Sequence, residues 1–207
     1  MEVPGSHEVR EVVLFYEMLG TATLIFAVNL GGGYFTPLAV GLTLFSNIAF
    51  FGSVSGGHFN PAVTAAVMVR LGLKNFASNL FYGLMIIMAQ LLGATIGVVL
   101  VFISSNVDAK SQTIDPAITL LCPTRQFGEL DVLCSGEGIQ GQVFLMEAAV
   151  TFTFVSVILA FKFDGASDDH IVAAKSIAVT LVCMILISAK VSGGCLNPAI
   201  GIIQTCF

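Results

Sequence analysis

Long apolar segments, separated by short polar ones, dominate the chain. Five of them are long enough for a helix to cross a bilayer, which takes about 20 residues. These five segments are residues 12–30, 35–54, 76–103, 141–161 and 171–189. Two shorter apolar stretches, 60–69 and 197–206, predict half-helices that enter the membrane and end inside it. The pattern therefore predicts an all-α membrane protein with five full spans and two re-entrant half-helices.

The same nine-residue pattern leads into each half-helix. Residues 55–63 read SGGHFNPAV, and residues 192–200 read SGGCLNPAI. Proline suits the first turn of a helix, and an asparagine directly before it is a strong N-cap. Each asparagine then keeps an NH2 group that can donate into a lumen. The motif residues on which this prediction rests are Asn60, Pro61, Ala62, Asn197, Pro198 and Ala199.

The two halves of the chain correspond to one another beyond these motifs. We expect one channel domain, 1–207, made of a first repeat, 12–103, a polar loop, 104–138, and a second, incomplete repeat, 139–207. The first half has three spans, an odd number, so the second half starts on the opposite face and is inverted. The half-helices then meet N-terminus to N-terminus, each end carrying about half a positive charge. Because a sixth span is absent, we expect either that the native chain continues past Phe207 or that a neighbouring chain packs there.

Composition and charge narrow the class of protein. Hydrophobic residues make up 56% of the chain and charged residues 10%, against about 25% charged residues in soluble domains. This indicates an integral protein of the plasma membrane or an organelle membrane. The net charge of −5 argues against a nucleic-acid partner. The five cysteines form no CxxC or Cys/His cluster, so we expect no metal or cofactor. No nucleophile–base arrangement indicates an enzyme.

Lysine and arginine are distributed unevenly over the two sides of the predicted bundle. Five fall on the side of the N-terminus and three on the other, and cytoplasmic loops are enriched in these residues. The five are Arg10, Arg70, Lys74, Lys162 and Lys175, and the three are Lys110, Arg125 and Lys190. The N-terminus and the polar turn 162–170 are therefore expected on the cytoplasmic side.

Two carboxylates, Glu17 and Glu147, lie inside predicted spans. An ionisable residue in a span is a functional hypothesis by default, and a proton relay is one such function. Their symmetric places in the two repeats favour another role, in which each accepts hydrogen bonds from N–H groups of a re-entrant loop. His58 either faces the lumen or is an ordinary packed histidine. Cys183 is expected to fill space in the core.

The two motifs, each within SGGxxNPA, and the stretch YEMLGT in the first span resemble the aquaporin, or major intrinsic protein, family. The resemblance covers residues 12–207. It implies six spans and two half-helices per pore, a homotetramer in the lipid bilayer, and passive conduction of water or small neutral solutes such as glycerol. It further implies that Asn60 and Asn197 donate to the permeant and that Glu17 and Glu147 brace the re-entrant loops.

The family's pores narrow at a four-residue filter, and an arginine usually follows the second motif. Counting from the motifs, the filter positions of this chain are Val40, Ile185, Gly194, Cys195 and Ile200. Ile200 stands where the arginine would be, so the filter is apolar and lacks a cation-repelling charge. Urea or ammonia are alternative solutes. The alternative function is that of a non-conducting structural or regulatory membrane subunit with the same fold. A coupled transporter is disfavoured because the sequence lacks carboxylates that would coordinate an ion.

Three cysteines lead to further expectations. Cys122 and Cys134 share the polar loop on the side where disulfides persist, so they either form a bridge or remain free thiols. Cys195 lies beside the expected filter, where a thiol can bind mercury and block the pore.

Overall fold

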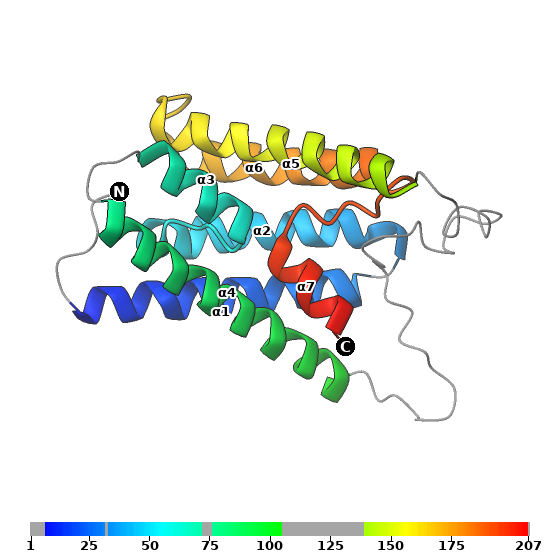
Figure 1. Cartoon of the computed structure of the whole chain (residues 1–207), viewed down its shortest axis with the longest axis horizontal. Helices are drawn as coiled ribbons and strands as arrows, with labels where there is room; N and C mark the ends of the chain where they lie inside the picture. The colour runs from blue at the N-terminus through cyan, green and yellow to red at the C-terminus, as the bar shows by residue number, and fades with distance from the viewer. Residues whose placement is uncertain (1–6, 32, 72–75, 105–138, 207) are drawn as a thin grey trace.

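The computed structural model describes residues 7–31, 33–71, 76–104 and 139–206, and most of this part of the chain is helical (Figure 1). In chain order the elements are α1 (His7–Leu30), the 3-10 helix η1 (Gly33–Phe35), α2 (Thr36–Ser55), α3 (Pro61–Leu71), α4 (Phe76–Ser104), α5 (Ile139–Phe163), α6 (His170–Ser188) and α7 (Pro198–Cys206). Within these described ranges, α1, α2, α4, α5 and α6 are long and apolar enough to cross a membrane. The expected five spans and two half-helices are confirmed. Cys122 and Cys134 lie outside the described residues.

The helix ends follow local signals in the sequence. Pro37 lies in the first turn of α2, where its missing N–H leaves no intrahelical bond unmade. α2 ends at Gly56, whose φ of 89° is natural for glycine and whose N–H donates to the Gly52 carbonyl over 3.0 Å. Asp169 begins α6 by accepting hydrogen bonds from two backbone N–H groups of its first turn.

Two boundaries differ from those expected. α1 begins at His7 rather than at residue 12, because the charged segment before the span is rich in residues that form helices well. α5 continues to Phe163, so Lys162 lies in its last turn rather than in the polar turn 162–170. A basic residue is favourable there because it faces the negative end of the helix dipole.

The two half-helices lie between the long helices and run away from one another from the middle of the bundle (Figure 1). α1 packs against α2 and α4, while α6 packs against α2 and α5. α3 rests on α4 and α5, and α7 rests on α4. The N-termini of α3 and α7 therefore face each other inside the bundle, which is the arrangement expected of an inverted repeat.

Small residues allow α4 to cross α1 closely. A Cβ atom added at Gly93 would collide with the backbone of Met18, and one at Gly97 would collide with the carbonyl oxygen of Ala22. Close backbone approach at glycines is typical of helix pairs in membranes, where association depends on packing rather than on a hydrophobic driving force.

The core of the bundle surrounds the two re-entrant loops. Phe59 and Leu196, which directly precede the motif asparagines, are 0% and 2% exposed. The outer faces carry large apolar side chains instead, among them the strongly exposed Phe50, Phe144 and Phe152. Since lipid tails are apolar, such exposure fits a protein that crosses the membrane several times.

Candidate functional site

Each motif asparagine caps the half-helix that follows it. Asn60 Oδ1 accepts a hydrogen bond from the Ala62 N–H over 2.8 Å, and Asn197 Oδ1 accepts one from the Ala199 N–H over 3.1 Å. Proline at the first helical position removes one of the N–H groups that would otherwise need a partner. The side-chain oxygen satisfies the next one.

The two asparagines also join the loops to each other. Asn60 Nδ2 donates to the Leu196 carbonyl, and Asn197 Nδ2 donates to the Phe59 carbonyl, each over 2.9 Å. The sequence predicted a whole NH2 group directed into the lumen. Instead, one N–H of each amide crosses to the opposite loop, so one N–H of each remains for another acceptor. Donation to a permeant remains a prediction.

The residue before each asparagine has a left-handed backbone. Phe59 has a φ of 48° and Leu196 a φ of 50°, values that cost energy for side chains of this kind. In both, the N–H donates to a glutamate and the carbonyl accepts from the asparagine of the opposite loop. Because such backbones persist only where their surroundings determine them, these paired contacts hold the two loops in one conformation.

Glu17 is fully buried and accepts four hydrogen bonds. Its Oε1 receives the Ser55 hydroxyl over 2.8 Å and the His58 N–H over 2.9 Å. Its Oε2 receives the Phe59 N–H over 2.6 Å and Gln90 Nε2 over 2.9 Å. Since charge-assisted hydrogen bonds are the strong ones, this carboxylate ties α1, the first loop and α4 together.

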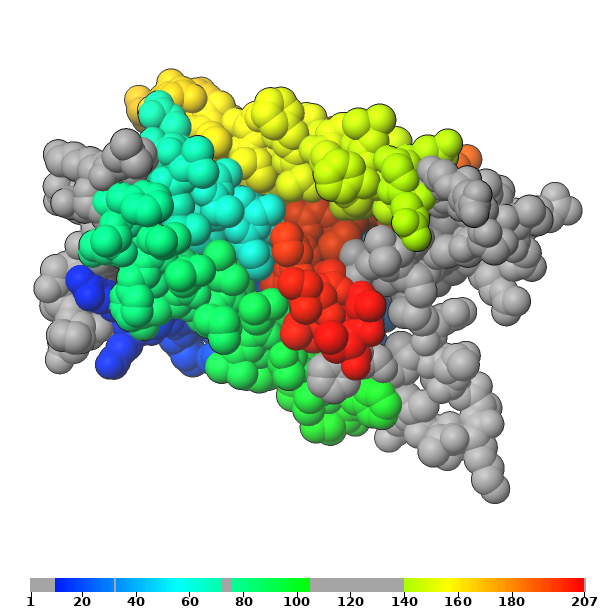
Figure 2. All heavy atoms as spheres, in the orientation of Figure 1, coloured from blue at the N-terminus to red at the C-terminus, as the bar shows by residue number. Residues whose placement is uncertain are grey.

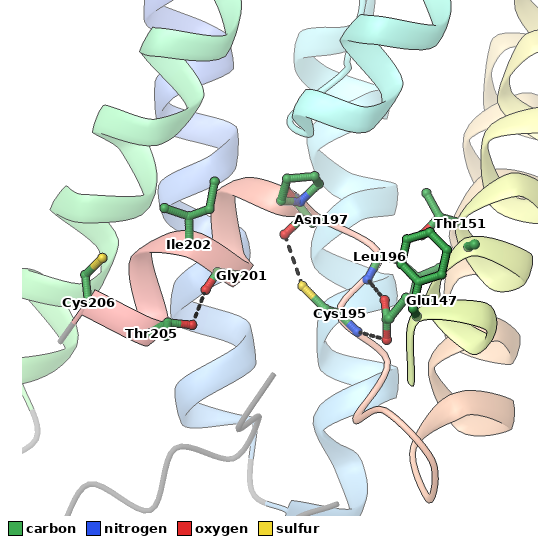
Figure 3. Close-up of a pocket in the computed structure, with 12 residues that line it drawn as sticks. Glu147, Thr151, Cys195, Leu196, Asn197, Gly201, Ile202, Thr205 and Cys206 are labelled. Atoms are coloured by element: carbon green, nitrogen blue, oxygen red, sulfur yellow. Dashed lines mark hydrogen bonds between the residues drawn. The ribbon is translucent and has the colours of Figure 1, made fainter. Parts of the chain in front are cut away.

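Glu147 is placed similarly against the second loop but is less enclosed. Its Oε1 accepts a hydrogen bond from the Ser192 hydroxyl. The same oxygen accepts from the Cys195 N–H over 3.0 Å, and Oε2 accepts from the Leu196 N–H over 2.9 Å (Figure 3). Among the described residues no side-chain amide reaches Glu147 as Gln90 reaches Glu17. The two carboxylates are therefore alike in their loop contacts and different in their surroundings.

Several residues of this network were missed by the sequence reasoning. Gln90 Nε2 also donates to Thr64 Oγ1 over 3.0 Å, and Thr64 Oγ1 lies 3.1 Å from His58 Nδ1. An amide deep inside the apolar segment 76–103 was the signal for Gln90, since polar groups within spans are costly and usually have a partner. His58 is buried, its Nδ1 lies beside the Thr64 hydroxyl, and it is among the residues that line a cavity; that it faces a lumen remains a prediction.

This cavity has a volume of about 30 Å³ and lies beside the paired loops. The expected filter positions Val40, Ile185, Gly194, Cys195 and Ile200 all line it. Asn60, Asn197 and His58 line it too, and most of the remaining lining is aliphatic. A space of this size holds at least one water molecule. The fold thus gathers the predicted site residues around one space, and their role in selecting solutes remains a prediction.

A larger cleft of about 650 Å³ runs along the outer side of the second loop, between α5 and α7. Figure 2 shows it as a recess between the yellow-green α5 and the red α7, with the orange second loop at its base. Glu147 and Cys195 line it, and the Cys195 thiol donates to the Asn197 carbonyl over 3.1 Å (Figure 3). The cleft explains why Glu147 is more accessible than Glu17.

One cysteine is not where the sequence suggested. Cys183 was expected in the core, but its side chain is exposed on α6. Apart from Lys175 near its start, the span 171–189 carries apolar or small residues on every face, so its sequence does not distinguish the face toward the bundle from the face toward lipid. In the described part of the chain, no group of three or more His, Cys, Asp or Glu side chains is placed to hold a metal ion.

Comparison with known proteins adds to this geometry. A model of the family described as "Major intrinsic protein" matches residues 11–203. Over 184 residues the chain is 35% identical to "Glycerol uptake facilitator protein-like 6" of Lactiplantibacillus plantarum, a match that covers 87% of this chain and 73% of that protein. It is 30% identical over 197 residues to "Aquaporin NIP3-1" of Arabidopsis thaliana, a match that covers 90% of this chain and 55% of that protein.

A solved structure resembles the fold. The X-ray structure of the aquaglyceroporin from Plasmodium falciparum matches with a TM-score of 0.67 and 19% identity, covering 95% of this chain and 80% of that one. Human "Aquaporin-4" is 31% identical over 163 residues, or 78% of this chain and 44% of that protein. The chain spans about half the length of the two aquaporins compared here.

Proposed function

The chain belongs to the major intrinsic protein family, and from that premise we propose that it is a passive channel for water and small uncharged solutes such as glycerol. It is a multi-pass integral membrane protein. The observation that supports the proposal most is the meeting of two half-helix N-termini, capped by Asn60 and Asn197, beside a cavity inside the bundle. The proposed centre of the passage is this pair of asparagines.

The chemistry of the passage suits a neutral molecule with lone pairs. The remaining N–H of each asparagine amide can donate to a water or alcohol oxygen, and both half-helices point their positive ends toward it. A cation there meets two positive helix ends, and the described lining of the cavity contains no carboxylate. Glu17 and Glu147 direct their oxygens to loop donors, which supports bracing rather than proton relay or ion coupling.

The lining of the cavity favours small polyols alongside water. Val40, Ile185 and Ile200 line it and offer no polar atoms, so a permeating water loses hydrogen bonds among them. A solute with a carbon backbone loses less, because part of its surface is apolar. Ile200 also leaves the space that a longer arginine side chain would occupy. We therefore propose a filter that admits glycerol at least as readily, relative to water, as one with arginine.

This function can be tested by stopped-flow light scattering on proteoliposomes. An osmotic gradient of an impermeant solute measures water flux, and a gradient of glycerol then measures glycerol flux. We expect Ile200→Arg to lower glycerol flux more than water flux, since arginine narrows the filter and adds donors that water uses well. Ile200→Met is the matched control of similar length without charge, and should reduce both fluxes less. Equal losses of both fluxes in Ile200→Arg contradict the proposed filter. Absence of both fluxes in the wild-type protein supports a non-conducting subunit instead.

We further propose that the channel assembles as a homotetramer in the bilayer. The large apolar side chains on its outer faces, including Phe81 and Phe152, are available to lipid or to neighbouring copies. Native mass spectrometry from detergent tests this proposal, and a monomer under conditions that preserve solute flux would contradict it.

A further inference from the structure

Lys162 places a cation at the inner end of the bundle, in the last turn of α5. Its Nζ donates to the carbonyl oxygen of Gly56. Gly56 ends α2 and opens the first re-entrant loop, two residues before His58. The ammonium group therefore lies against the loop whose His58 and Asn60 line the cavity.

Arg70, another described cation that contacts α5, is exposed and paired with a carboxylate. Arg70 forms an ion pair with Asp164 over 3.1 Å, and both side chains are at least half exposed. Its guanidinium also covers the ring of Phe163 at 5.4 Å. Water, salt and the partner carboxylate weaken the field of such a surface pair. Lys162 is half-buried and binds a neutral carbonyl, and no described carboxylate forms an ion pair with it.

The field of Lys162 reaches the groups around the first loop. Gly56, which accepts its hydrogen bond, lies two residues before His58, whose N–H donates to Glu17 and whose side chain lines the cavity. Glu17 already accepts four hydrogen bonds, including two from loop N–H groups. A cation entering from this end would meet the charge of Lys162 beside the first loop, in surroundings where low-polarity walls strengthen electrostatic interactions.

We propose that Lys162 is a specificity-determining residue of the channel, whose ammonium group repels cations, including hydrated protons, at the inner entrance to the passage. It thereby supplies the charge that Ile200 leaves missing at the opposite filter. This inference rests on the proposed function of the chain as a channel for neutral solutes. Neutral permeants are unaffected by the charge, so it raises selectivity without reducing their flux.

A purely structural role for Lys162 is the alternative to be separated. A cation at a helix C-terminus stabilises that helix, and the bond to Gly56 places Lys162 at the end of α2. Lys162→Gln retains an N–H donor for a carbonyl and removes the charge. Lys162→Met removes both the charge and the N–H donor, and Lys162→Arg keeps both the charge and the donor. The charge and the hydrogen bond therefore change independently across the three variants.

The experiment uses proteoliposomes that contain a pH-sensitive dye and carry a potassium gradient, so that proton and potassium leak can be measured. Water and glycerol flux are measured in the same preparation. We expect Lys162→Gln and Lys162→Met each to raise cation leak roughly tenfold, because a unit charge held against the first loop is removed. Lys162→Arg should behave like wild type. Arg70→Gln, which removes an exposed and paired cation, is the control and should leave the leak unchanged.

Each outcome decides the question. Unchanged leak in Lys162→Gln, or a rise only in Lys162→Met, overturns the inference and assigns Lys162 to the helix end alone. An equal rise in Arg70→Gln also overturns it, since general surface charge would then be responsible. If the wild-type protein passes neither water nor glycerol, the proposed function fails and this inference fails with it. If both solutes pass and no variant leaks, only this inference fails.

Discussion

Replacing Glu17 by glutamine changes one atom in the most enclosed part of the site. The carboxylate is 0% exposed, and its two oxygens each accept two hydrogen bonds. Glutamine keeps one oxygen and puts an NH2 group in place of the other. Two donors then face this NH2 in either orientation of the amide.

The loss of stability depends on which of the four donors can turn to accept a hydrogen bond from the new NH2 group. The Ser55 hydroxyl can rotate and the Gln90 amide can flip to accept, but the backbone N–H groups of His58 and Phe59 cannot. One loop N–H is therefore left buried without an acceptor, which costs about 1–3 kcal/mol, and the retained bonds lose the extra strength of a charged acceptor. We expect Glu17→Gln to lower the free energy of unfolding by about 3 kcal/mol. With the NH2 in the place of Oε2, the left-handed backbone at Phe59 loses one of its two supports, and with the NH2 in the place of Oε1, the His58 N–H loses its acceptor.

Glu147→Gln is the matched control because Glu147 makes the same loop contacts beside an open cleft. Glu147 accepts three hydrogen bonds instead of four, and its loop donors are only partly buried, so we expect a smaller loss, of about 1 kcal/mol. Heating both variants and the wild type in the same detergent, followed by circular dichroism at helix wavelengths, measures the order of their Tm values. Equal Tm losses, or a larger loss in Glu147→Gln, would refute the reasoning that enclosure by α4 and Gln90 sets the magnitude.

Two further predictions concern the loops. Asn60→Leu and Asn197→Leu should abolish water and glycerol flux, because each removes a helix cap and a hydrogen bond between the loops. Asn60→Asp keeps the capping oxygen, so it should retain more helical structure on heating than Asn60→Leu while still losing flux. Flux at the wild-type level in either leucine variant, in the same stopped-flow assay, would contradict this. Mercury should inhibit flux through Cys195, which lines both the cavity and the cleft, and Cys195→Ser should relieve the inhibition. Undiminished inhibition in that variant would assign the effect to the exposed Cys183 or Cys206.

Much of this protein could be predicted from the sequence because its signals are local or periodic. Apolar length alone defines five spans, since the hydrocarbon thickness of the bilayer is set. Asparagine followed by proline defines the start of α3 and of α7, since capping and the first-turn preference of proline act within three residues. Duplication of the motif after an odd number of spans implied the inverted arrangement, which is a matter of counting.

Tertiary structure decided which groups the motifs contact. The sequence placed Glu17 and Glu147 near loops, but not Gln90 against one of them, nor the open cleft beside the other. The place of Gln90 depends on how α4 crosses α1 at Gly93 and Gly97, and the cleft depends on how α5 and α7 lie beside the second loop; no local pattern encodes such long-range packing. The hydrogen bond that each asparagine amide donates to the opposite loop could not be predicted either, because its acceptor belongs to the other half of the chain.

The same distinction holds for side chains within apolar helices. Cys183 was expected inside and lies on the outer face, and Lys162 was expected in a turn and lies against the first loop. In a span that is apolar on every side, hydrophobic periodicity does not mark the buried face, because lipid and protein interior are equally apolar. The sequence by itself therefore determined the number of spans and half-helices and the starting points of the two half-helices. Only the packed bundle decided which of their faces meet, and with them the surroundings of every buried polar group.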